Sequence, residues 1–286
     1  MIMPILQTAF IVLALLATTL TGITPVQRVY GIAPPETEPG DHVSTRPSLR
    51  VLVFTKTAGF RHASIPDGIK ALKQLGTKHR FTVEATEDAD VFSDESLKHY
   101  EVVVFLNTTG DVLSDAQQAA FERFIRNGGG FVGVHSATDT EYDWPWYGRL
   151  VGAYFAGHPQ IQDAVVNVQN HKHPATRHLP ARWARRDEWY NFRAQPKGVT
   201  VLASLDVDSY EGSTMDPHPI AWCHTFDGGR AFYTEGGHTK ASYSDEAFRK
   251  HLAGGIFWAA GQSKRFFDEA DAIKTERGAQ PDDPRP

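Results

Sequence analysis

The amino-acid sequence predicts an α/β fold in which a mainly parallel sheet is covered by helices on both faces. Strand-like and helix-like segments alternate from residue 49 to residue 134, as in chains that build a parallel sheet with crossover helices. The run EVVVFL at residues 101–106 is continuously apolar, which is typical of a parallel strand buried on both faces. Ser114 and Gln117 have the spacing of a capping box, which marks the start of a helix.

The first half of the chain predicts four strands separated by three helices. Apolar residues recur at helical spacing across residues 65–75, whereas residues 81–85 alternate like a half-buried strand. Asp94 and Glu95 suit the first turn of a short helix, and the glycines at 128–130 end the third helix. The predicted strands are 49–54, 81–85, 101–106 and 131–134, and the predicted helices are 65–75, a short helix from Ser93, and 114–127.

The second half is less regular and predicts further strands and a closing helix. Asp227, Gly228 and Gly229 give a hairpin turn signal between two of these strands. We find no internal repeat. The predicted strands are 164–168, 199–205, 219–226 and 230–234, and the closing helix is 244–260.

The composition is that of an ordinary globular protein, with 41% hydrophobic and 22% charged residues and a formal net charge of -5. Arg182, Arg185 and Arg186 form only a local basic cluster. Nucleic acid is therefore not expected as a partner, because phosphate binding needs a concentrated positive surface. The single cysteine, Cys223, lies in an apolar stretch and is interpreted as a small core residue.

The chain ends predict how the protein is organised. Residues 9–20 form an apolar run of signal-peptide length, too short to span a membrane comfortably. We therefore expect an exported protein, periplasmic or secreted and free of the membrane in its mature form, with a membrane anchor as the alternative. The predicted organisation is a signal-peptide region at 1–30, a disordered lead-in at 31–46, one folded domain at 47–262 and a loose tail at 263–286.

Polar side chains are expected to gather at one edge of the sheet. In open parallel sheets, ligands bind beyond the carboxyl ends of the strands. His135 stands directly after the strand at 131–134, and the loops at 55–68 and 107–111 open on the same edge. Other histidines stand beside glycine or proline or in a loop that such a sheet would hold, and these candidates are His62, His158, His218 and His238.

The stretch DEWYNF places Asp187 and Glu188 beside three aromatic residues. A carboxyl group near aromatic walls can act as a general acid or base. Trp144 and Trp146 add an aromatic pair after the His135 turn, and flat aromatic rings can contact the C–H faces of sugars. An edge strand with exposed acids, and a packing cluster of tryptophans, remain the alternative interpretations.

Several common signatures are missing from the sequence. It contains neither a Walker loop nor an HExxH motif, and no convincing GxGxxG follows the first strand. No cofactor is therefore expected. The histidines and Glu188 could bind a divalent metal, but they are too scattered for their spacing to define a geometry.

Six motifs follow one another along the folded part of the chain: TKTAGFRHASIPDG, GGGFVGVHSATDT, WYGRLVGAYFAGHP, DEWYNF, HPIAWCHTFDGGRAFYTEGGHT and HLAGGIFWAAG. Taken together and in this order, they resemble the trehalose-utilisation (ThuA-like) family. The resemblance covers about residues 50–261 and implies a three-layer α/β/α sandwich, flavodoxin-like and similar to class I glutamine amidotransferases.

The resemblance also implies a role for the turn at His135. In amidotransferases of this fold, a nucleophilic cysteine stands on a sharp turn within GxCxG. Here residues 133–137 read GVHSA, so His135 stands where that cysteine would be. Glutamine hydrolysis through a cysteine thioester is therefore not expected. The family is linked to sugar catabolism, especially beside dehydrogenases that make 3-keto-sugars.

We therefore expect an enzyme that acts on a small carbohydrate by acid-base hydrolysis, elimination or isomerisation of a sugar or 3-keto-sugar. His135 is expected to be partly exposed in a cleft, near the other catalytic residues. A non-catalytic sugar-binding module and a metal-dependent hydrolase remain alternatives, and a homo-oligomer stays open. The predicted catalytic residues are His135, Glu188, His158 and His238, and the predicted substrate-binding residues are His62, Asp187, Tyr190, Trp144, Trp146 and His218.

Overall fold

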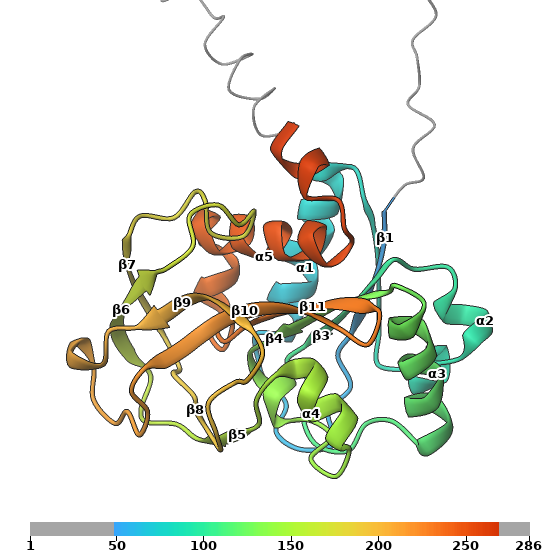
Figure 1. Cartoon of the computed structure of the whole chain (residues 1–286), viewed down its shortest axis with the longest axis horizontal. Coiled ribbons are helices and arrows are strands. Elements are labelled where there is room, and N and C mark those ends of the chain that lie inside the picture. The colour runs from blue at the N-terminus through green and yellow to red at the C-terminus, as the bar shows by residue number, and fades with distance from the viewer. Residues whose placement is uncertain (1–48, 269–286) are drawn as a thin grey trace, which may run out of the picture. The chain divides into compact units, whose positions relative to one another are not determined.

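A nine-stranded sheet runs through the computed structural model, which describes residues 49–268 (Figure 1). A separate pair, β5 and β8, lies outside this sheet. The strands are β1 (Arg50–Phe54), β2 (Thr82–Thr86), β3 (Val102–Leu106), β4 (Gly130–Val134), β5 (Phe155–Gly157), β6 (Gln162–Val168), β7 (Arg182–Asp187), β8 (Asn191–Phe192), β9 (Thr200–Leu205), β10 (His218–Phe226) and β11 (Gly229–Thr234). The helices are α1 (Ile65–His79), α2 (Asp94–Leu97), α3 (Asp115–Arg126), α4 (Pro145–Val151) and α5 (Glu246–Ala259), with 3₁₀ helices η1 (Ala89–Val91), η2 (His135–Asp139), η3 (Val207–Ser209) and η4 (Lys240–Tyr243).

The sheet has a parallel part and an antiparallel part. Its order is β2-β1-β3-β4-β11-β10-β9-β6-β7. The strands from β2 to β11 pair in parallel, and each pair from β11 to β7 is antiparallel. The predicted turn at Asp227 and Gly228 joins β10 to β11 as a hairpin, so the change to antiparallel pairing falls at β10.

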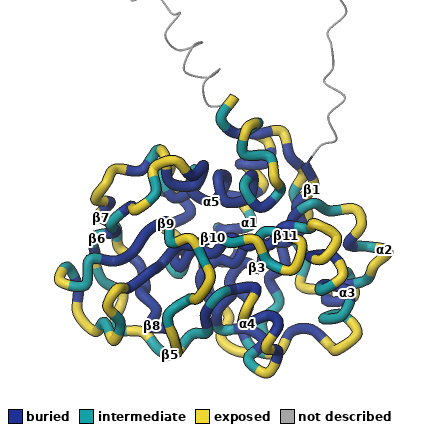
Figure 2. The backbone as a smooth tube through the Cα atoms, in the orientation of Figure 1, coloured by how far each residue is buried: buried dark blue, intermediate teal, exposed yellow. Residues whose placement is uncertain are grey.

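Helices cover both faces of the sheet, and the strands supply a core to each. Val51 and Val53 of β1 pack in the core that also contains residues of α1 and α5, whereas Leu52 and Phe54 pack in the core beneath α3 and α4. This division follows from the two-residue side-chain period of a strand. Figure 2 shows the central strands buried and the outer loops exposed. The predicted α/β sandwich is therefore confirmed.

Local details agree with several sequence signals. The Ser114 backbone N–H donates to Gln117 Oε1 at 2.9 Å, so the predicted capping box is present. The predicted loose tail is corrected at its start, because residues 263–268 are helical and Phe266 is buried against Phe257. The predicted signal region at 1–30, the lead-in at 31–46 and the tail beyond 268 lie outside the described residues. Within residues 49–268, no helix is both long and apolar enough to cross a membrane.

The topology brings distant segments to one edge. The parallel strands β1, β3, β4 and β11 all end there. Four antiparallel pairings separate β11 from β7, and an even number of reversals gives β7 the same direction as β11. The residues that follow these strands therefore share the carboxyl edge predicted to bind ligands.

Candidate functional site

His135 stands on a sharp turn between β4 and η2. Its backbone φ is +51°, a left-handed conformation that costs a residue with a side chain about 1–3 kcal/mol. The Tyr233 hydroxyl and the Thr138 hydroxyl donate to the His135 carbonyl oxygen at 2.8 and 3.3 Å. These bonds hold the strained turn, which has the strand-to-helix position expected from the resemblance.

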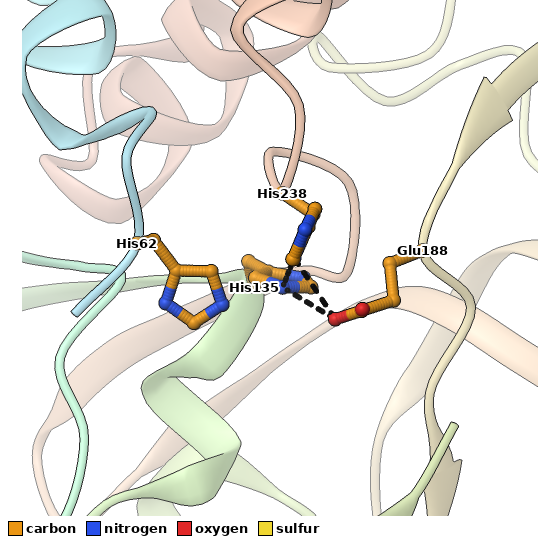
Figure 3. Close-up of side chains that lie close together, drawn as sticks. All are labelled: His62, His135, Glu188 and His238. Atoms are coloured by element: carbon orange, nitrogen blue, oxygen red, sulfur yellow. Dashed lines mark hydrogen bonds and ion pairs between the residues drawn. The ribbon is translucent and has the colours of Figure 1, made fainter. Parts of the chain in front are cut away.

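Three histidines and one carboxylate meet at this edge, as Figure 3 shows. Glu188 Oε2 lies 2.9 Å from His238 Nδ1 and 3.4 Å from His135 Nε2. The two imidazole nitrogens are 3.2 Å apart, and the His62 ring packs edge-on against both rings. One potential ligand atom from each residue lies within 4.8 Å of the others. We call His62, His135, Glu188 and His238 the His–Glu cluster.

A backbone carbonyl sets the orientation of the His135 ring. His135 Nδ1 lies 2.8 Å from the carbonyl oxygen of Glu235. Because a carbonyl oxygen only accepts, Nδ1 carries a proton and donates it. When the ring is neutral, Nε2 therefore presents a lone pair to Glu188 and His238.

Burial and neighbouring groups set the charges of the His–Glu cluster. Burial opposes ionisation of Glu188, but hydrogen bonds and electrostatic interactions with His135 and His238 outweigh it, so the pKa of this carboxyl lies below its ordinary value. The pKa of His62 falls to about 3, first because burial disfavours the charged ring and then because His135 and His238 repel it. Glu188 is therefore ionised and His62 neutral at neutral pH.

His158 lies at the open side of the His–Glu cluster. Its side chain is 42% exposed, and its Nδ1 lies 3.2 Å from Glu188 Oε1. The same nitrogen donates to the Pro159 carbonyl oxygen at 2.9 Å, which leaves Nε2 able to accept a proton. An open cleft of about 590 Å³ lies beside both residues, a size that suits a small ligand. Further residues of its lining are Gln160, Ile161, Gln162 and Glu211.

Tyr190 supports the site from within the protein. Its ring centre lies 4.3 Å from that of His135 and 5.9 Å from that of His158. The Tyr190 side chain is buried, so the ring packs against these two histidines. Its predicted contact with substrate is therefore replaced by a contact with the residues that line the site.

Asp187 was expected to bind substrate, and the structure corrects this expectation. Asp187 is fully buried and forms an ion pair with Arg185 at 2.8 Å. Its carboxylate also accepts from the backbone N–H groups of Gly237, at 2.9 Å, and Thr239, at 3.3 Å. These two residues flank His238, so Asp187 holds the loop that carries this histidine.

His218 also differs from its predicted substrate-binding role. It is buried, and its Nε2 donates to the Tyr190 carbonyl oxygen at 2.7 Å. Its Nδ1 accepts from the Tyr210 hydroxyl at 2.5 Å. Both ring nitrogens are therefore engaged within the protein, and His218 fixes the backbone at Tyr190.

Trp144 and Trp146 pack together away from the His–Glu cluster, with ring centres 5.2 Å apart. Both rings contact Phe121 in the core beneath α3 and α4. Trp146 Nε1 donates to Asp227, which precedes the amino end of β11, whereas the cluster lies beyond the carboxyl end of that strand. The prediction that these rings bind substrate is corrected, and the packing interpretation holds.

The expected exposure of His135 is also corrected. Its side chain is 0% exposed, whereas that of His238 is 20% exposed. The rings of His62, His238 and Tyr190 pack against it and exclude solvent. His135 therefore acts through its neighbours, and solvent meets the site at His238 and His158.

Two residues that adjoin the site were not predicted from the sequence. Glu235 is completely buried, and burial raises the pKa of its carboxyl well above the ordinary value; its Oε1 accepts from the Tyr190 backbone N–H at 2.5 Å. Phe60 is 66% exposed, and its ring centre lies 4.9 Å from that of His62. An acid directly after an apolar strand and an aromatic residue beside a loop histidine are the sequence signals that could have found them.

The fold and this site define an α/β sandwich protein with a polar histidine–carboxylate site at the carboxyl edge of its sheet. The family model for trehalose utilisation, ThuA, matches residues 50–259. The chain therefore belongs to the ThuA family, within the class I glutamine amidotransferase-like superfamily. This membership suggests a carbohydrate-related role.

Solved structures agree with this assignment. A ThuA-like protein from Bacteroides uniformis is 25% identical, with a TM-score of 0.67, and the match covers 81% of this chain and 100% of that one. A ThuA-like protein from Parabacteroides merdae is 21% identical, with a TM-score of 0.63, and covers 75% of this chain and 90% of its own. A search of curated proteins finds no match.

Proposed function

We propose that this protein is an enzyme that transfers protons on a sugar or 3-keto-sugar at the His158–Glu188 pair. One observation carries the proposal: the two oxygens of Glu188 face different partners. Oε2 faces the buried rings of His135 and His238, and Oε1 faces the exposed His158. The carboxylate thus connects a protected polar site to a histidine that can exchange protons with solvent.

The proposed chemistry begins beside a carbonyl group of the sugar. A C–H bond next to a ketone is acidic enough for an imidazole to remove its proton. His158 Nε2 would accept this proton, and the electron pair would move onto the ketone oxygen to form an enediolate. Return of the proton to the neighbouring carbon gives isomerisation, and departure of a protonated leaving group gives elimination.

The surroundings of the site suit a carbohydrate. Among residues 49–268, the large hydrophobic side chains that are exposed are Phe60 and Ile161. Phe60 lies beside His62, and Ile161 lines the cleft with His158. Sugars combine apolar C–H faces with hydroxyl groups, and Gln160, Gln162 and Glu211 of the same cleft offer hydrogen-bonding groups. The pKa of Glu188 is lowered and that of His62 is lowered to about 3. A protein that only binds sugar would rarely need groups with pKa values shifted in this way.

We further propose that the protein is exported, on the basis of the apolar run at residues 9–20. Expression in a bacterial host followed by N-terminal sequencing of periplasmic protein tests this proposal. A mature start after residue 20 and before residue 49 is the expected result. Recovery of intact Met1 from the cytosol alone would contradict export.

A substrate screen tests the enzymatic proposal. The purified protein is incubated with glycosides and their 3-keto derivatives, and products are followed by mass spectrometry. We expect turnover, and a loss of about 10²–10⁴-fold in His158→Ala. His171→Ala is the matched control, because His171 is an exposed histidine in a turn. No turnover of any compound, or equal turnover in both variants, would refute the proposal.

A further inference from the structure

We propose that the His–Glu cluster binds one divalent transition-metal ion of the zinc type. The ligands are His135 Nε2, His238 Nδ1 and Glu188 Oε2. The chemical role of this ion rests on the proposed function, in which a group beside His158 must stabilise the oxygen of an enediolate. The binding site itself stands on geometry.

The distances between the ligand atoms match the edges of a coordination shell. Atoms bound at about 2.0–2.1 Å from zinc are about 2.9 Å apart in an octahedron and about 3.3 Å apart in a tetrahedron. The observed separations are 2.9 Å between His238 and Glu188, 3.2 Å between His135 and His238, and 3.4 Å between His135 and Glu188. An ion equidistant from these three atoms therefore fits the arrangement of the side chains.

When His135 Nε2 and His238 Nδ1 carry no proton, the lone pairs of these three atoms converge, and a cation between them removes their repulsion. The proton of His135 is held on Nδ1 by the Glu235 carbonyl, so the neutral ring presents an unprotonated Nε2. A proton on His238 Nδ1 forms a hydrogen bond with Glu188 or with His135, but a single proton does not bond to all three atoms. A metal ion satisfies all three donors at once.

Neighbouring groups hold the ligands in these orientations, as is usual for metal-binding histidines. The Glu235 carbonyl and the Tyr190 ring fix His135. Asp187 accepts from the backbone on both sides of His238. The His62 ring packs edge-on against the rings of both histidine ligands. Imidazole with carboxylate suits zinc and neighbouring first-row ions rather than magnesium or calcium.

The ion would occupy the place where the proposed reaction develops negative charge. A zinc site with three protein ligands keeps its fourth position open for substrate, and His238 is the most exposed of the three ligands, at 20%. A bound ion polarises a ketone oxygen, while His158 on the other oxygen of Glu188 accepts the proton. The metal and the base are thus held by the same carboxylate.

A metal titration of the full chain tests the inference. Tag-free protein is treated with a chelator, dialysed and titrated with Zn²⁺ by calorimetry, and then loaded with Co²⁺ to record its visible absorption. We expect one ion per chain for the wild type and for His171→Ala. His238→Ala should bind at least about 100-fold more weakly, because it loses a direct ligand where loss of a supporting residue already costs 10–100-fold.

Each outcome decides one of the two proposals. Failure of the wild type to bind an ion, or equal affinity in folded His238→Ala, overturns the metal site. If His238→Ala does not fold, Glu188→Gln and the wild-type cobalt spectrum, which reports nitrogen coordination directly, decide. Turnover that persists in chelator with no bound ion removes the ion's role in the reaction and leaves the enzymatic proposal. Tight metal binding without turnover of any sugar retains the metal site and removes the enzymatic proposal.

Discussion

Replacement of Asp187 by asparagine tests how the protein positions its site. The side chain keeps its shape but loses its charge. Asp187 is fully buried, and its partner Arg185 has a side chain that is only 7% exposed. Removing one partner of a buried ion pair costs about 3–5 kcal/mol, because the other charge stays buried and unpaired.

The hydrogen bonds around this carboxylate support a cost of that size. An asparagine has one acceptor oxygen, and its NH₂ group must face donors wherever it points. Even in the better of its two orientations, the amide loses the two longer hydrogen bonds, those accepted by Oδ1, along with the charge. Oδ2 accepts from the side chains of Arg185 at 2.8 Å and Ser242 at 2.7 Å and from the backbone N–H of Gly237 at 2.9 Å. Oδ1 accepts from the backbone N–H groups of Glu188 at 3.1 Å and Thr239 at 3.3 Å.

Urea unfolding of Asp187→Asn measures the loss, with Asp163→Asn as the control. Asp163 on β6 pairs with Arg186 on the neighbouring β7, but these side chains are 79% and 59% exposed, so the control should change stability by less than about 1 kcal/mol. Asp187→Asn should lose about 3–5 kcal/mol and bind the proposed metal about 10–100-fold more weakly. Equal losses in the two variants would refute the role of Asp187 in holding the site.

Three further predictions concern the core, the mouth of the site and the loop. Burial disfavours the charged ring of His251 and lowers its pKa to about 3. As pH falls below about 6.5, the histidine of the unfolded chain binds a proton before that of the folded chain, so the free energy of unfolding should fall by about 2 kcal/mol between pH 7 and pH 5. Urea midpoints measured over this pH range should show this loss in the wild type and lack it in His251→Gln. Phe60→Ala should raise KM for the verified sugar several-fold and leave kcat and stability nearly unchanged, whereas an unaltered KM would remove Phe60 from the binding site. Gly237→Ala should destabilise the protein by about 1–3 kcal/mol, because φ is +123° and its Cβ would lie 2.7 Å from Tyr243 Oη, whereas Gly157→Ala, with no atom within 4 Å, is the control in thermal unfolding.

The strands and helices of the first half could be predicted because their signals are local. Apolar runs, helical spacing and the capping box depend only on nearby residues. The edge strand β7 was missed because its sequence, RWARRD, has three arginines among six residues and only two buried side chains, Trp183 and Asp187. The two-residue strand β8 is too short to give a periodic signal.

The site residues that could be predicted from the sequence are mainly those that stand in or beside turns. The sequence identified His135, His158 and His238 because each stands in or beside a glycine-containing turn. It could not separate Asp187 from Glu188, since the alternation at the end of β7 sends adjacent side chains to different surroundings. Asp187 enters a network with Arg185, and Glu188 enters the His–Glu cluster. Tertiary packing decides which end of the sheet an aromatic pair contacts. Substrate binding by Trp144 and Trp146 was therefore wrongly predicted, because both rings pack against Phe121.

The turn at His135 presents a side chain that is nevertheless closed to solvent. A nucleophile must reach its substrate, but the His135 side chain is 0% exposed, so attack on a substrate is not its role. A strained φ of +51° is kept because the bonded carbonyl and the fixed Nδ1 leave Nε2 in one orientation, toward Glu188 and His238. Such fixed placement is of little use to a group that must shuttle protons between substrate and solvent. It suits a ligand of the proposed metal ion, and in the proposed function His158, whose side chain is 42% exposed, transfers the proton.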